Sequence, residues 1–115
     1  MGRIRIHQFN KTIDNNFTSS KDSIMIPTNV KKVVAICPTL QNGTGILSIY
    51  KEESNEEVLN QVTISDDNLN WKDKNIPILV DCGGENFFYV LRLLDSNINK
   101  RCELKLSISY EEEDK

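Results

Sequence analysis

The feature that most constrains this chain is a strict alternation of apolar and polar residues near its C-terminus. In CELKLSISY, residues 102–110, every second side chain from Cys102 to Tyr110 is apolar, and the residues between them are Glu, Lys or Ser. Successive side chains of a β-strand point to opposite faces of the sheet, so this pattern predicts a strand with one buried and one exposed face.

Other strand-like runs, separated by turn residues, recur along the chain. They are RIRIHQF, DSIMIP, VKKVVAIC, GILSIYK, EEVLNQVTIS, IPILVDCGG and NFFYVLRLLD, of which the last is the most apolar and predicts a central strand. No segment shows convincing helical periodicity. About eight short strands at this spacing predict an all-β fold, an antiparallel β-sandwich or jelly roll, as a single domain over residues 1–115.

Three segments lack the strand pattern. PTLQNGTG, residues 38–45, predicts an extended hairpin loop between its flanking strands. The polar stretch 10–22 predicts a long loop that, with the residues before it, forms an N-terminal arm or loop over residues 1–22. The alternative for the start of this arm is a first strand of the protein's own sheet. The acidic tail, residues 111–115, is expected to fray.

Composition excludes several classes of protein. A net charge of −3 provides no basic face for general nucleic-acid binding. The chain has no apolar signal-peptide core and no run of transmembrane length, so we expect no membrane insertion. Three cysteines, an odd number without C-x-x-C spacing, indicate reduced thiols, a cytoplasmic setting and no metal site.

Catalytic chemistry is sparse. The only histidine, His7, could in principle pair with Cys82 in the DCGG turn, but no base is predicted beside that cysteine. The D-x-N-x-N run from Asp66 has Trp71 where a calcium loop needs glycine and Pro77 in place of the closing glutamate. The sequence therefore predicts a protein that is not an enzyme and holds no cofactor or metal.

A turn beside the only tryptophan carries a family resemblance. SDDNLNW, residues 65–71, resembles the S-x-D-G-x-x-W turn of discoidin-like β-sandwiches and of small phage structural proteins, with Asn68 in place of glycine. Asparagine tolerates the left-handed backbone better than other non-glycine residues. The strand FFYVLRLLD resembles the Y-V-R-L strand of these families, with Leu91 inserted. The resemblance covers residues 58–95 and implies a β-sandwich.

In such turns the tryptophan normally packs over the sheet edge, which favours Trp71 as a structural plug over a ligand platform. A sugar-binding face would expose two or three coplanar aromatic rings. Phe87, Phe88 and Tyr89 alternate within one strand, and Tyr50 and Tyr110 also lie in strand patterns. Most aromatic rings are therefore predicted to lie inside.

The resemblance, together with the sparse catalytic chemistry, implies a non-enzymatic phage virion component, such as a capsid decoration, head-fibre or tail accessory protein. It would assemble in the host cytoplasm as a homo-oligomer, for example a trimer, and dock on other virion proteins. The predicted contacts are Arg3, Ile4, Arg5, Ile6, Phe9 and Phe17. The alternative is a discoidin-like carbohydrate-binding module, in which Asp67, Asn70 and Trp71 would line a glycan site at the loop end.

Overall fold

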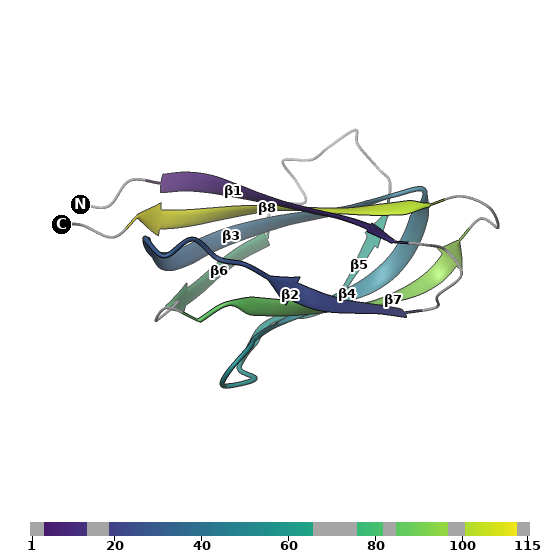
Figure 1. The fold of residues 1–115 in the computed structure, drawn as a ribbon. Coiled ribbons are helices and arrows are strands. Elements are labelled where there is room, and N and C mark those ends of the chain that lie inside the picture. The colour runs from purple at the N-terminus through teal and green to yellow at the C-terminus, as the bar shows by residue number, and fades with distance from the viewer. Residues whose placement is uncertain (1–3, 14–18, 66–75, 82–84, 97–100, 113–115) are drawn as a thin grey trace.

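A computed structural model gives the fold (Figure 1). It describes residues 4–13, 19–65, 76–81, 85–96 and 101–112 of the chain. The strands are β1 (Ile4–Ile13), β2 (Ser19–Ile24), β3 (Val30–Gln41), β4 (Gly43–Lys51), β5 (Glu57–Ser65), β6 (Ile76–Asp81), β7 (Phe87–Ser96) and β8 (Cys102–Glu112).

The strands form two antiparallel four-stranded sheets. Sheet A has the order β1-β8-β3-β6 and sheet B the order β2-β7-β4-β5. The first strand pairs with the last, β2 with β7, β3 with β6, and β4 with β5. This nested pairing, wrapped into two facing sheets, is the jelly-roll arrangement. The predicted all-β sandwich is therefore confirmed, and β7 occupies the central position expected of the most apolar strand.

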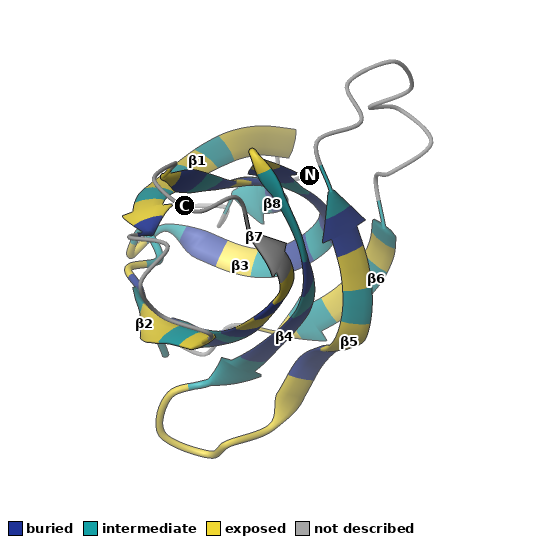
Figure 2. Ribbon diagram, turned by 90° about the vertical axis from the view of Figure 1, so that its right-hand side faces the viewer, coloured by how far each residue is buried: buried dark blue, intermediate teal, exposed yellow. Residues whose placement is uncertain are grey.

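One shared core holds the two sheets together. In Figure 2 both sheets curve around a common interior. The alternating apolar residues of β8, from Cys102 to Tyr110, all point into it and are buried. Sheet B contributes inward side chains from β4 and β7, namely Leu47, Ile49, Phe87, Tyr89 and Leu91. Each such side chain stabilises the fold by about 1.5–3 kcal/mol relative to exposure.

The predicted hairpin at residues 38–45 is wrong. β3 continues through Pro38 to Gln41, and β4 begins at Gly43 in the other sheet, so the chain turns a corner between sheets at Asn42. Asn42 has φ 68, a left-handed conformation that asparagine tolerates. Pro38 pairs with Leu106 of β8, while the described pairing of β3 with β6 ends at Ile36.

The predicted loop over residues 10–22 is also wrong at both ends. β1 extends to Ile13 and β2 begins at Ser19, so only residues 14–18 lie between them, outside the described residues. The register of β1 with β8 is unbroken from Ile4 to Ile13, and this non-local ladder supplies the order that the polar sequence did not predict. The acidic tail is corrected in the same way, since β8 includes Glu112 and only residues 113–115 lie outside the description.

Candidate functional site

The N-terminal strand β1 is the least protected edge of the sandwich. β2 and β6 are edge strands of 6 residues each, and β6 also contains Pro77. The edge strand β5 has register shifts and a residue, Gln61, with φ 43. β1 has 10 residues without a proline or a register shift. Short strands, prolines and bulges are among the features that prevent pairing with another chain, and β1 has none of these three, although it carries the charged residues Arg5 and Lys11.

Two large aliphatic side chains of β1 face solvent. Ile4 is 61% exposed and Ile6 is 66% exposed, and they lie opposite Glu111 and Ser109 of β8. These residues belong to the outer surface of sheet A, which we call the A face. The inward positions of β1 are taken by the other alternating set, which ends in the buried Ile13.

The A face is hollowed next to Ile6. The hollow, of about 570 Å³, exists because small residues such as Ser107 and Ser109 occupy the central strand β8. We call it the A-face hollow, and its lining consists of Ile6, Gln8, Asn10, Cys37, Thr39, Lys105, Leu106, Ser107 and Ser109. An exposed isoleucine beside a shallow recess of small residues is a surface that can receive side chains from another protein.

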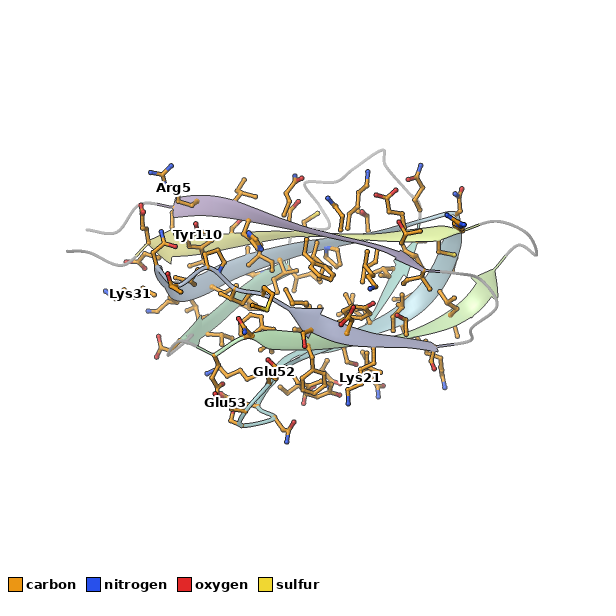
Figure 3. The ribbon with its side chains drawn as sticks, viewed as in Figure 1. Arg5, Lys21, Lys31, Glu52, Glu53 and Tyr110 are labelled. Carbon is orange, nitrogen blue, oxygen red and sulfur yellow. The ribbon has the colours of Figure 1, made fainter. Side chains whose placement is uncertain are left out.

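The remaining predicted contacts have different locations. Phe9 was expected to contact a partner but lies on the inward side of β1 and packs against the core, with its ring centroid 5.9 Å from that of Tyr89. Arg5 lies at the end of β1, where its Nε is 3.3 Å from a carboxylate oxygen of Glu112 (Figure 3). Arg3 and Phe17 lie outside the described residues.

The alternative ligand loop lies outside the described part of the chain. Asp67, Asn70 and Trp71 all lie outside the described residues, so the plug and the platform remain predictions for this tryptophan.

The outer surface of sheet B, which we call the B face, carries an aromatic pair that the sequence analysis missed. Tyr50 and Phe88 lie directly opposite each other on β4 and β7. Their rings stack with centroids 5.3 Å apart and an interplanar angle of 28°. The Lys21 ammonium lies 4.8 Å from the Phe88 ring centroid. Because β7 lies between β2 and β4, Lys21 and Tyr50 flank Phe88 on opposite sides.

The alternation of the sequence held a signal for this pair. Tyr89 shares its face with the buried Phe87 and Leu91, which places Phe88 on the outer face. Tyr50 lies next to the buried Ile49 and so also faces outward. What the alternation could not supply was the register that sets the two rings side by side.

A β-bulge shapes the B face next to Tyr50. Leu47 of β4 pairs with Val62 and Ile49 pairs with Leu59, so one residue of β4, Ser48, opposes two residues of β5. The Ser48 hydroxyl accepts a hydrogen bond from the Gln61 backbone N–H at 3.2 Å, which explains why a serine is buried here.

Two hollows flank the aromatic pair. The one over Ser48, which we call the B-face hollow, has about 330 Å³ and is lined by Ile46, Ser48, Tyr50, Gln61, Val90 and Arg92. The other has about 430 Å³ and is lined by Lys21, Asp22, Ser23, Glu52, Asn55 and Phe88. In the second hollow the Ser23 hydroxyl donates to Glu52 at 3.0 Å, so part of its polar lining is already paired.

The titratable groups of the described residues do not form a reaction centre. Cys37 and Cys102 are buried, as their strand pattern predicted, and burial raises the pKa of the Cys102 thiol. A buried, protonated thiol is a poor nucleophile. Burial also raises the pKa of the Tyr89 hydroxyl, which shares a 2.8 Å hydrogen bond with Ser20. Cys82 lies outside the description.

Among the described residues, no group of three or more His, Cys, Asp or Glu side chains could hold a metal ion. The described part of the chain also contains no helix that is long and apolar enough to cross a membrane.

No family model matches the chain, and no curated protein matches it in sequence.

Proposed function

We propose that this chain is a non-enzymatic structural protein of a virion, such as a phage capsid decoration, head-fibre or tail accessory protein. It would assemble in the host cytoplasm and act by self-association and by docking on other virion proteins. The observation that carries this proposal is the edge strand β1, which has no proline and no register shift, and whose exposed Ile4 and Ile6 lie beside the A-face hollow.

The physical mechanism is the burial of this edge against a second copy. Pairing a strand with β1 supplies backbone hydrogen bonds, and covering Ile4 and Ile6 removes apolar surface from water, at about 25 cal/mol per Å². A two-fold contact would place the β1 edge of each copy against the other, whereas a head-to-tail contact would close a ring such as a trimer. Both arrangements bury the same two isoleucines.

The fold adds a further argument by analogy. Eight-stranded jelly rolls recur in viral capsid domains and in lectins. Because one fold hosts many functions, this argument is weaker than the one from the exposed edge.

The proposal is tested by the solution mass of the purified protein, measured by gel filtration with light scattering over a range of concentrations. We expect an oligomer whose population grows with concentration. The double variant Ile4→Lys/Ile6→Lys should be monomeric, because charged side chains at these positions cannot be buried in the contact. Leu94→Lys is the matched control, since Leu94 is an exposed aliphatic residue of sheet B, 52% exposed. A wild-type protein that is monomeric at every concentration contradicts self-association.

A second candidate function is carbohydrate binding, which the Tyr50–Phe88 pair on the B face favours. This pair lies away from the loop of Asp67, Asn70 and Trp71 in sequence, and it supplies two adjacent outward-facing aromatic rings.

A further inference from the structure

We propose that the B-face hollow binds a carbohydrate that carries a carboxylate group, such as a sialic or uronic acid. This inference rests on the second candidate function, carbohydrate binding, and assigns it a site and a ligand class. It is independent of the assembly role of the A face, because the two surfaces lie on opposite sides of the sandwich.

One wall of the hollow is an aromatic ring that is already fixed in place. Tyr50 stacks on Phe88, which is in turn flanked by the Lys21 ammonium. A ring held by its neighbours loses little conformational entropy when a ligand packs against it. Together with the aliphatic Ile46 and Val90, it provides apolar contact for the C–H groups of a sugar ring.

The hollow is also lined by two planar polar groups, one from each strand that neighbours β4: Arg92 of β7 and Gln61 of β5. The Gln61 carboxamide comes from the bulge of β5, where a left-handed backbone, φ 43, interrupts the strand, and bulges re-aim side chains next to binding sites. Neither this carboxamide nor the Arg92 guanidinium is hydrogen-bonded or ion-paired to another described residue. Both groups are therefore free to bond hydroxyl or carboxylate oxygens of a ligand.

Charge selects the ligand class. Among the residues that the structure describes, Arg92 is the only charged residue that lines the B-face hollow, and none of its described lining residues is acidic. A guanidinium presents a planar fork of donors that matches a carboxylate. The neighbouring hollow differs, because Lys21 shares it with two carboxylates, Asp22 and Glu52, which outnumber the single cation. The B-face hollow therefore complements a single negative charge, and its volume of about 330 Å³ lies within the usual range for small-ligand sites, about 300–1,000 Å³.

The test is a titration of the ¹⁵N-labelled full chain, followed by NMR, with 3′-sialyllactose, lactose, trigalacturonic acid and a tetraglutamate peptide as probes. We expect at least one of the two acidic sugars to shift the resonances of Ser48, Tyr50, Gln61 and Arg92. Lactose should bind about tenfold more weakly or not at all, because a hydrogen bond to a charged group contributes about that factor.

Variants localise the effect. Arg92→Ala should weaken the binding of the acidic sugar about tenfold, because Arg92 is exposed and supplies the only charge of the hollow. Tyr50→Leu should weaken it as well, by removing the ring wall. Lys105→Ala is the matched control, since it removes an exposed cation from the A face and should leave sugar affinity unchanged.

The outcomes distinguish a failure of this binding site from a failure of carbohydrate binding as a function. Equal binding of lactose and sialyllactose overturns the carboxylate assignment, and preference for tetraglutamate overturns the sugar class. Sugar binding that survives Arg92→Ala and instead shifts residues 65–71 overturns this site but keeps carbohydrate binding as a function. No binding of any sugar overturns both.

Discussion

The A face and the B face are both solvent-facing sides of a four-stranded sheet, yet they are built differently. The centre of the A face carries small side chains, Ser107 and Ser109, next to the exposed Ile6 at its edge. The centre of the B face carries two large rings, Tyr50 and Phe88, fastened to each other and flanked by a cation. One face is recessed at its centre and bordered by exposed aliphatic residues, whereas the other has a stacked pair of rings at its centre with a hollow on each side.

Each face suits a different kind of partner. A recess beside an unpaired strand edge fits the side chains and backbone of another protein, because edge pairing supplies hydrogen bonds and the recess receives side chains. The B face offers a stacked pair of aromatic rings next to the planar polar groups of Gln61 and Arg92. Such a surface suits a small ligand that has both apolar C–H groups and polar groups. We therefore propose assembly as the role of the A face and ligand binding as the role of the B face.

The largest effect is expected from a substitution in the core that both sheets share. Leu104→Ala empties a fully buried position of β8 and should lower the free energy of unfolding by about 2–5 kcal/mol. Lys105→Ala, one residue further on the opposite side of the same strand, should change it by less than about 0.5 kcal/mol. Urea denaturation measures both. Comparable losses in the two variants would mean that the inward and outward sets of β8 are misassigned.

A smaller effect is expected from a substitution at the point where β4 pairs with β7 in sheet B. A Cβ at Gly45 would lie 2.9 Å from the backbone oxygen of Arg92 and 2.9 Å from the Leu91 side chain. Gly45→Ala should therefore push β4 from β7 and cost about 1–3 kcal/mol. Binding at the B-face hollow should weaken, while the oligomer formed through β1 persists. Thr44→Ala is the neighbouring control. If Gly45→Ala dissolves the oligomer and leaves sugar binding intact, the assignment of the two faces is reversed.

The smallest effect concerns the ion pair that joins the two sheets at one edge. Lys11 Nζ of β1 lies 2.7 Å from Asp22 of β2. The hydrogen bond that Lys11 donates to Asp22 lowers the pKa of the Asp22 carboxyl. The same hydrogen bond raises the pKa of the Lys11 ammonium. The Asp22 contribution to stability is thus present above the carboxyl's pKa in the unfolded chain and is lost as pH falls through the lower folded value. The Lys11 contribution is lost as pH rises through the raised folded value.

Asp22→Asn should therefore lower stability slightly at neutral pH, and the difference from wild type should vanish in acid. The effect is small because both side chains are substantially exposed, 41% and 46%. Denaturant unfolding as a function of pH measures it. A difference that grows in acid would mean that this pair does not stabilise the fold.

The sequence predicted those parts of the structure that depend on local alternation. The inward set of β8 from Cys102 to Tyr110 and the central place of β7 followed from periodicity alone. β2 was predicted only in part: the run DSIMIP covers its last residues, whereas its polar start becomes a strand only through pairing with β7. The corner at Asn42 was missed because the same residue types, such as Asn and Gly, form both hairpin turns and turns between two sheets.

The candidate sites divide in the same way. Ile4 and Ile6 could be named from the sequence, because they stand out in a polar strand, although Phe9 of the same strand proved to be a core residue. The Tyr50–Phe88 pair could not, because two strands far apart in the sequence must first take up their register. The bulge that places Gln61 beside Ser48 is likewise a non-local feature.

The measurement that tests the division of the two faces most directly is a dilution series followed by ¹H–¹⁵N NMR without any ligand. The account predicts concentration-dependent shifts at Ile4, Ile6 and Ser109 of the A face, with Tyr50 and Arg92 of the B face unchanged. Concentration-dependent shifts confined to the B face, or none on the A face, would contradict it.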